Sequence, residues 1–483
     1  MTTNALRAAR WATVAGLVVL GAGVLAGFLS YETRPNYDSM WSIVWARELL
    51  DGQAPSLDAY RAPTQHPLLV AVSLALIALG DAAPAALVAL TLASFVVLVA
   101  AIIRLGAATL GVLAGLVAAA LLATRLNFAF LAAFAYVDIP FLALLVWAAA
   151  LAARGDRPSP IVWALLVAAG LLRPEGWAFA LMYAVWAWRG ATARQRLGAL
   201  VAVAAAPALW ALSDLLMTGD PLFSWTYTTD SAARFGRNRG LLDLPASTLR
   251  SAAESVKPPV LALALVGVGL ALWLQRRRAT VPLALAAGGT ATFALITLQG
   301  FSAIPRYFAI ATVGLLLFAA YALTGWELLE RGTRVCRGWA IAAALVAVAG
   351  GAFVAATLNP VKVDAELRLR EGVFANLDTL LDDPKVAAGR RCGPISLPNH
   401  KLVPFLRWRL DAGPADVVAR SDLRAKARTR RGVAIVVRDI PGIRAHTAFG
   451  SRGAEGDGPE VVPAPPGFRL VAQTHALTAW ARC

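Results

Sequence analysis

The chain has 483 residues, of which 58% are hydrophobic and only 15% are charged. A soluble domain carries about 25% charged residues, and a mean hydropathy of +0.63 over the whole length argues against a soluble fold. The net charge of +16 could suggest nucleic acid, but the arginines cluster in short loops between apolar runs rather than along one face. These properties predict a lipid environment and no nucleic-acid partner.

The apolar runs predict an all-α polytopic membrane protein with about eleven transmembrane helices. The first run, 11–29, is long enough to span a bilayer and lacks a small-residue cleavage site, so we interpret it as a retained helix rather than a signal peptide. The other expected spans are 82–103, 106–123, 139–153, 159–172, 177–189, 197–213, 259–275, 280–298, 307–326 and 339–358. The run from His66 to Gly80 is shorter, and we assign it to an external loop as a re-entrant or interfacial segment.

The distribution of arginines predicts the orientation of these spans. If the spans alternate in direction, the arginine clusters between them fall on one side of the membrane, as the positive-inside rule requires. The clusters are Arg7/Arg10, Arg104, Arg154/Arg157, Arg189/Arg194/Arg196, Arg276/Arg277/Arg278 and Arg331/Arg334/Arg337. We therefore expect a multi-pass protein of the bacterial inner (plasma) membrane with a cytoplasmic N-terminus. The long loops at 30–81 and 213–258 then face the other side, where functional residues are expected.

A change in composition after Asn359-Pro360 predicts two domains, a transmembrane domain at 1–359 and a soluble extracytoplasmic domain at 360–483. Strand-like runs at Val433–Ile440 and Phe468–Trp480 and a helical stretch at Val363–Leu381 indicate a small α/β fold for the second domain.

The three cysteines fall on different sides in this topology. Cys392 and Cys483 both lie in the C-terminal domain, on the oxidising side, where a disulfide between them is plausible. Cys336 lies among the cytoplasmic arginines, so we expect it to remain reduced.

Ionisable side chains near membrane depth cost several kcal/mol unless they are paired, so they are candidate functional residues. Asp38 follows the first span and opens an amphipathic stretch. It is either a helix N-cap, which the pattern alone favours, or a catalytic base. Arg61 and His66 lie in a segment stiffened by two prolines. A lone histidine is usually a hydrogen-bonding anchor, and His66 becomes a catalytic candidate because Asp38 shares its loop.

Further candidates lie at the expected outer ends of later spans. Asp138 precedes Pro140 at the start of a span, where a cap and a functional carboxylate are equally consistent, and a distant arginine, a metal or a ligand must compensate its charge. Arg173 and Glu175 form either a surface ion pair, worth under about 1 kcal/mol, or a site where an arginine meets a phosphate. Arg306 is either an interfacial anchor or a ligand of an anionic headgroup.

Taken together, these features resemble the GT-C superfamily of membrane glycosyltransferases, which use polyprenyl-phosphate sugars. The most similar groups are the protein mannosyltransferases and the lipid A aminoarabinose transferases. The resemblance covers roughly residues 10–330 and does not extend to the C-terminal domain. It depends on the order of Asp38, Arg47-Glu48, Gln65-His66-Pro67, Val137-Asp138-Ile139-Pro140, the Gly-Leu-Leu-Arg-Pro-Glu-Gly turn at 170–176, Gly219-Asp220-Pro221-Leu222-Phe223 and Arg306-Tyr307-Phe308.

The resemblance implies roles for these residues. Asp38 would be the general base on the acceptor, and Asp138 would bind the acceptor or a metal, with Glu48 and Glu175 as further candidates for that role. Arg173 and Arg306 would hold the donor phosphate, assisted by Arg61 or His66. Relatives often carry an acidic residue and a lysine before the proline, where Gln65 and His66 stand here, so a divalent metal is left open.

The implied partners are a polyprenyl-phosphate-linked sugar, a glycan, glycolipid or protein acceptor, and the lipid bilayer. Two other classes remain as alternatives. A transporter or flippase would place ionisable residues in the middle of spans and show repeated halves. A non-catalytic scaffold for cell-envelope assembly would use Asp38, Asp138 and Arg173 only as caps and anchors.

Overall fold

The computed structural model describes residues 3–155, 158–234, 241–299, 301, 304–330, 332–357, 360–438 and 464–483. Arg157, Arg331, Asn359 and the last two residues of the expected strand Val433–Ile440 lie outside these ranges, as do the side chains of Arg7 and Arg10.

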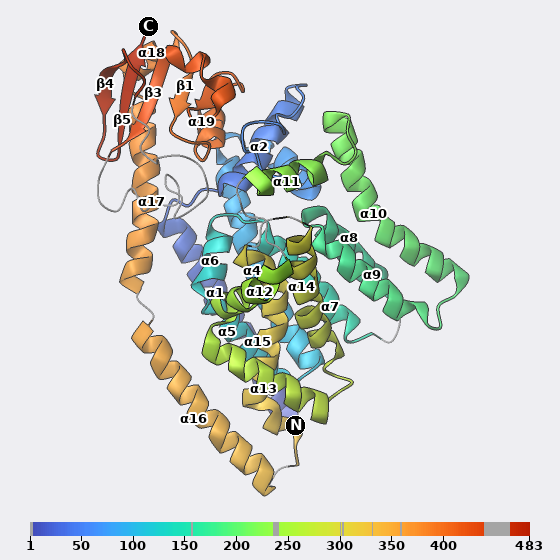
Figure 1. Cartoon of the computed structure of the whole chain (residues 1–483). Coiled ribbons are helices and arrows are strands. Elements are labelled where there is room, and N and C mark those ends of the chain that lie inside the picture. Colours follow the sequence, from blue (N-terminus) through green and yellow to red (C-terminus); the bar gives the residue numbers. More distant parts are fainter. Residues whose placement is uncertain are drawn as a thin grey trace.

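The molecule is a bundle of helices with a small sheet domain at the end far from the N-terminus (Figure 1). Each of the eleven expected spans coincides with a helix. These helices are α1 (Thr3–Ser30), α4 (Ala83–Ala108), α5 (Val112–Ala123), α7 (Asp138–Ala152), α8 (Pro160–Leu172), α9 (Glu175–Trp188), α10 (Ala193–Thr218), α13 (Pro258–Leu274), α14 (Thr280–Leu298), α15 (Ala309–Thr324) and α16 (Arg334–Thr357).

By length and composition, six of the described helical segments could cross a membrane, or up to eight if each bent helix pair is one span. This is fewer than the expected eleven, because α5, α7, α8, α9 and α13 are only 12, 15, 13, 14 and 17 residues long. The prediction of a mostly helical, multi-pass membrane protein is confirmed. Which end of the bundle faces the cytoplasm stays a prediction.

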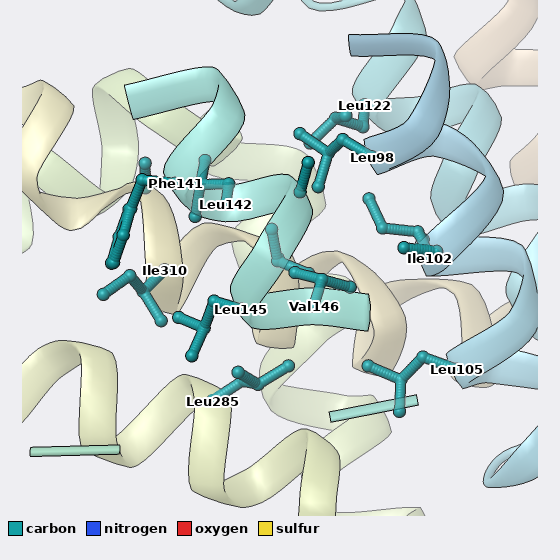
Figure 2. Close-up of a cluster of buried hydrophobic side chains, with 14 of the residues drawn as sticks. Leu98, Ile102, Leu105, Leu122, Phe141, Leu142, Leu145, Val146, Leu285 and Ile310 are labelled. Atoms are coloured by element: carbon teal, nitrogen blue, oxygen red, sulfur yellow. The ribbon is translucent and has the colours of Figure 1, made fainter. Parts of the chain in front are cut away.

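The bundle core consists of aliphatic and aromatic side chains from helices distant in the sequence. Figure 2 shows Leu98, Ile102 and Leu105 of α4 facing Leu142 and Val146 of α7. Elsewhere Gly267 of α13 lies so close to the backbone of Phe318 that a Cβ atom there would overlap its carbonyl group. Small residues allow this approach where lipid provides no hydrophobic force between helices.

Both expected external loops contain helices. The first holds α2 (Tyr37–Leu50), α3 (Pro67–Leu76) and the 3₁₀ turn η1 (Ile77–Ala82). Its apolar run is therefore helical, and Gly80, with a φ of 57°, breaks it before α4. The second loop holds α11 (Phe223–Arg234), η2 (Leu241–Asp243) and α12 (Leu244–Val256). Three more short helices, α6 (Leu126–Ala133), η3 (Pro305–Phe308) and η4 (Gly325–Leu328), complete the described bundle elements.

The C-terminal part is a mixed α/β fold, as expected. Its helices are α17 (Pro360–Leu381), α18 (Pro384–Arg390), α19 (Val403–Arg409), η5 (Leu423–Ala425) and η6 (Arg428–Arg430). Its strands are β1 (Ile395–Leu397), β2 (Val417–Ala419), β3 (Gly432–Val437), β4 (Arg469–Gln473) and β5 (Leu477–Arg482). The sheet order is β2-β1-β3-β5-β4, with β1 parallel to β2 and β3, and β5 antiparallel to β3 and β4.

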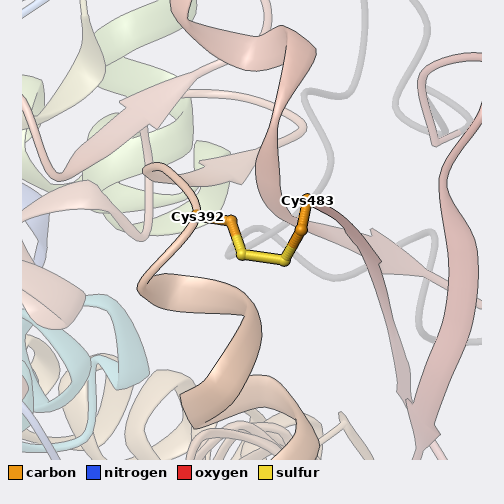
Figure 3. Close-up of a disulfide and its surroundings, with 2 residues drawn as sticks. All are labelled: Cys392 and Cys483. Carbon is orange, nitrogen blue, oxygen red and sulfur yellow. A yellow bond between two sulfur atoms is a disulfide. The ribbon is translucent and has the colours of Figure 1, made fainter.

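Two features of the cysteines and strands follow from this topology. The run Phe468–Trp480 is not one strand, because the chain reverses between β4 and β5. A disulfide joins Cys392 to Cys483, which connects the end of α18 to the end of the chain (Figure 3). Cys336 is a free, buried cysteine at the start of α16.

The C-terminal part shares a hydrophobic core with the first external loop. Trp41 and Trp45 of α2 lie in the same buried cluster as Leu406 of α19 and Val417 of β2. Within this contact, Arg407 Nη2 donates to Glu48 Oε1 at 2.5 Å, and both side chains are almost fully buried. The sequence boundary at residue 360 therefore separates two parts that pack on each other.

Candidate functional site

A cavity of about 1010 Å³ lies where helix ends of the bundle meet both external loops and the C-terminal part. Its acidic, basic and histidine lining residues come from widely separated parts of the sequence. They are Arg34, Asp38, Arg61, His66, Asp138, Arg173, Glu175, Asp214, Arg306, Arg370, His400 and Lys401. Seven of the eight ionisable sequence candidates for catalysis or binding therefore meet in one cavity, and Glu48 is the exception.

Helix N-termini border this cavity. Asp38 is in the first turn of α2, His66 directly precedes α3, and Asp138 and Glu175 are the first residues of α7 and α9. The unpaired N–H groups at such ends and the helix dipole favour a bound anion. The helix N-termini and the arginines therefore both contribute positive electrostatic potential in the cavity.

Asp38 is not the N-cap of α2, which corrects the interpretation that the local pattern favours. Asn36 takes this position, and its Oδ1 accepts hydrogen bonds from the N–H groups of Asp38 and Ser39 at 2.8 and 3.3 Å. Asn36 and Ser39 also donate to the carbonyls of Phe134 and Ala135, which ties the start of α2 to the segment before α7. The Asp38 carboxylate is left to face the cavity, where Arg306 Nη2 donates to it at 3.2 Å.

Asp138 does not cap its helix either, since α7 has no side-chain cap hydrogen bond. Its Oδ1 instead accepts a hydrogen bond from Arg173 Nη1. Arg173 also donates to Glu175 through Nε at 3.1 Å and Nη2 at 2.5 Å. All three side chains are more than nine-tenths buried, so the surface ion pair considered for Arg173 and Glu175 is wrong. The distant arginine that Asp138 requires is Arg173.

Arg306 lies in η3, beside Arg173. The ring of Tyr307 contacts both guanidinium groups, with centroid distances of 4.6 Å to Arg173 and 5.6 Å to Arg306. The ring centroid of Tyr136 lies 5.1 Å from the Arg306 guanidinium. These aromatic faces attract cations and hold the two arginines in place without neutralising them. Nε of Arg306 and Oδ2 of Asp138 are buried and have no hydrogen-bond partner within the described ranges.

His66 packs edge-on against Trp210 and has a buried Nδ1 without a hydrogen-bond partner among the described atoms. Burial, with the nearby Arg173 as the second cause, lowers the pKa of His66 to about 4. His66 is therefore neutral at pH 7 and offers a hydrogen bond rather than a positive charge. Arg61, with a positive φ of 57°, lies in the same loop and also lines the cavity.

Glu48 does not join the other candidates. Arg407 and the N–H and hydroxyl of Ser56 bind its two carboxylate oxygens. The carboxylate is therefore occupied in the contact between α2 and α19, and it is not available for an acceptor or a metal. Nor do the described residues contain a group of three or more His, Cys, Asp or Glu side chains that could hold a metal ion. Asp138 and Glu175 would have to release Arg173 to bind one.

Asp214, a buried carboxylate of α10 that lines the cavity, was not predicted from the sequence. It accepts hydrogen bonds from Gln65 Nε2 at 2.7 Å and from the N–H and hydroxyl of Ser224 at 2.9 and 2.7 Å. It thereby joins both external loops. His400 and Lys401 of the C-terminal part, which also line the cavity, were not predicted either. The only signal for Asp214 was an acidic residue near the outer end of an apolar run, and none marked the other two.

The fold is that of a polytopic membrane protein whose helical bundle carries a mixed α/β part at one end, with the cavity between them. The chain is similar over its full length to the crystal structure of ArnT from Cupriavidus metallidurans bound to undecaprenyl phosphate. The TM-score is 0.54 at 14% identity, with 100% of this chain and 98% of that chain covered. The apo structure of the same protein has a TM-score of 0.53 at 15% identity, with 97% and 98% covered.

No protein-family model matches the sequence, and no curated protein matches it. At 14–15% identity the similarity to ArnT is one of fold. The resemblance to the aminoarabinose transferases is confirmed at this level. It extends beyond residues 10–330, because the similarity includes the C-terminal part.

Proposed function

We propose that this protein is an inverting membrane glycosyltransferase that takes a sugar from a polyprenyl-phosphate donor. The observation that carries the proposal is one cavity that holds a carboxylate, Asp38, beside the clustered arginines Arg173 and Arg306. The fold is that of ArnT, which has been solved with undecaprenyl phosphate bound. A phosphate lipid is the kind of ligand that such a cationic cavity accommodates.

Asp38 is the proposed general base. It takes the proton of the acceptor hydroxyl as the hydroxyl oxygen forms a bond to the anomeric carbon of the sugar, and the bond from that carbon to the phosphate oxygen breaks. A single displacement of this kind inverts the anomeric centre. Arg306 Nη2, at 3.2 Å, forms an ion pair with the Asp38 carboxylate and orients it in the cavity. A positioned base contributes about 10²–10⁴-fold to such reactions.

Arg173 and Arg306 are the proposed partners of the departing phosphate. The leaving group gains negative charge as its bond to the sugar breaks, and preorganised cations stabilise that charge in a site shielded from water. Asp138 and Glu175 hold Arg173 in one orientation through their ion pairs. We assign these two carboxylates to positioning Arg173. Neutral His66, whose buried Nδ1 has no hydrogen-bond partner among the described residues, adds a hydrogen bond to the phosphate.

The apolar part of the cavity wall supports a lipid-linked donor. Trp210 of α10, Trp225 of α11, Ile296 of α14 and Phe301 line the same cavity as the arginines. A polyprenyl chain could lie along this wall while its phosphate reaches Arg173. The cavity lies at the end of the bundle next to the C-terminal part, so we place the acceptor, which is a glycan, glycolipid or protein, on the extracytoplasmic side.

The test is transfer by the purified protein from a panel of radiolabelled polyprenyl-phosphate sugars, with release of polyprenyl phosphate as the readout. Asp38→Asn should lower turnover by at least about 10²-fold while the thermal unfolding midpoint stays close to that of the wild type. Asp51→Asn, an exposed change at the other end of α2, is the matched control. Near-wild-type turnover in Asp38→Asn would remove Asp38 from the mechanism. Movement of intact donor across vesicles without cleavage would favour the transporter alternative.

A further inference from the structure

We propose that Tyr37 and Ser39, the residues on either side of Asp38, are positioning residues for the transfer reaction. Their hydroxyl groups hold the proposed base in register with the arginines that are assigned to the donor phosphate. This inference rests on the proposed function and deepens it. It concerns two side chains that are not among the sequence candidates.

The first observation is a pair of hydrogen bonds that leave from both sides of the base. Tyr37 Oη donates to the carbonyl of Arg61 at 3.0 Å, and Ser39 Oγ donates to the carbonyl of Ala135 at 2.5 Å. Each hydroxyl has a single proton, and in both cases a backbone carbonyl accepts it. The start of α2 is therefore fixed to two segments that lie 24 and 96 residues away along the chain.

The second observation is the backbone conformation of the two acceptors. Arg61 and Ala135 have φ values of 57° and 51°, and among the described residues only two other non-glycine residues, Lys257 and Asp411, have a positive φ. This left-handed conformation is costly for a residue with a Cβ atom, and it persists where the surrounding contacts determine it. Two of these four strained residues present their carbonyls to the hydroxyls beside Asp38. The strain is thus concentrated where the proposed base is held.

The third observation is that the Ala135 side of this arrangement continues to the arginines. Tyr136 follows Ala135 in the chain, and its ring centroid lies 5.1 Å from the Arg306 guanidinium. Arg306 Nη2 in turn donates to the Asp38 carboxylate at 3.2 Å. The contacts therefore form a closed ring, which runs from Asp38 through Ser39 and these residues and back to Asp38. A closed ring fixes the base and the cation relative to each other.

The proposed reaction explains why this relative position matters. In a single displacement the acceptor and the leaving phosphate occupy opposite sides of the anomeric carbon, so the base and the phosphate site must be separated by the length of the sugar. A misplacement of about 1 Å can cost about 100-fold in rate. Asp38 lies in the first turn of α2, whereas Arg173 is held within the bundle by Asp138 and Glu175. Loss of the two hydroxyl bonds should therefore displace the base and leave the phosphate site formed.

The experiment deletes the two hydroxyls and measures turnover and binding separately. The variants are Tyr37→Phe, Ser39→Ala and their combination. The assay is release of undecaprenyl phosphate from the undecaprenyl-phosphate sugar that the wild type cleaves, with a total membrane extract as the source of acceptor. Turnover is expressed per site that binds free undecaprenyl phosphate, so that unfolded protein does not contribute.

Each single variant should lower kcat per binding site by about twofold to tenfold, because Asn36 still ties the start of α2 to Phe134. The double variant should lower it by about tenfold to a hundredfold. The Kd for undecaprenyl phosphate should stay close to that of the wild type in all three variants. Ser39→Thr keeps a hydroxyl group at this position and should retain most of the turnover.

Ser42→Ala and Tyr321→Phe are the matched controls, because each removes a buried hydroxyl that has no hydrogen-bond partner among the described residues. Ser42 is also on α2 and, like Ser39, is 1% exposed. Both controls should keep the wild-type kcat per binding site.

The inference is overturned if the double variant turns over like these controls, or if Ser39→Thr is as slow as Ser39→Ala. It is also overturned if the double variant loses affinity for undecaprenyl phosphate in parallel with turnover, since that marks a purely structural role. Failure of the proposed function looks different, because the wild type would then release no polyprenyl phosphate from any donor.

Discussion

Removal of the Glu48–Arg407 ion pair should strongly destabilise the contact between the bundle and the C-terminal part. The side chains of Arg407 and Glu48 are 2% and 5% exposed, and Arg407 also donates to Ser56 Oγ at 2.8 Å and lies over the ring of Trp41. Truncation of one partner leaves the other as an uncompensated buried charge, which costs about 3–5 kcal/mol. Glu48→Leu and Arg407→Met should each lose stability of this order.

The double variant distinguishes the energetic contribution of the ion pair from that of the surrounding residues. In Glu48→Leu/Arg407→Met neither charge remains, and buried ion pairs replaced by apolar residues are often neutral in stability. We therefore expect the double variant to be more stable than either single variant, which requires a coupling free energy of at least about 3 kcal/mol in magnitude. The assay is thermal unfolding in detergent together with limited proteolysis of the C-terminal part.

The matched control is Arg424→Met, which breaks the pair with Asp422 on the surface of the same domain. Its arginine is 66% exposed, and such pairs contribute about 0–1 kcal/mol. If the Glu48 and Arg407 single variants unfold like this control, or if their effects simply add, the pair does not hold the two parts together.

Three further predictions concern the cavity. Arg173→Met leaves Asp138 and Glu175 buried without a cation, so it should lower the free energy of unfolding by about 3–5 kcal/mol and abolish donor turnover. An unchanged thermal unfolding midpoint would contradict the three-residue network. Asp214→Ala leaves the donors of Gln65 and Ser224 unpaired and should cost about 3 kcal/mol, whereas the exposed Asp220→Ala should cost far less. His66 has a pKa of about 4 in the folded protein and about 6.5 when unfolded. As the pH falls, the unfolded state therefore takes up the proton before the folded state does. The free energy of unfolding is at its full value above pH 6.5 and decreases as the pH falls from about 6.5 towards 4. His66→Gln should flatten this part of the unfolding profile, and a profile identical to the wild type would refute the low pKa.

The helices follow from the sequence because their signal is local. An apolar run long enough to cross a bilayer must satisfy its own backbone hydrogen bonds, which in a single segment means a helix. The eleven expected spans therefore coincide with helices of the structure. Even the local signal has limits, since Asn36 and Asp38 are both good capping residues two positions apart. Only the packing of Asn36 against the carbonyl of Phe134 decides between them.

The pairing of charges was decided by the tertiary structure alone. The partner of Asp138 lies 35 residues away, that of Asp38 lies 268 residues away and that of Glu48 lies 359 residues away. The sequence shows that each carboxylate needs compensation, because burial of a lone charge is costly. It does not show which of many arginines provides it, since every arginine carries the same charge and only the folded chain brings particular ones within hydrogen-bond distance. For this reason the sequence predicts both Asp38 and Glu48 as candidate site residues. Only the folded structure shows that Asp38 lines the cavity, whereas Glu48 is buried against Arg407 of the C-terminal part.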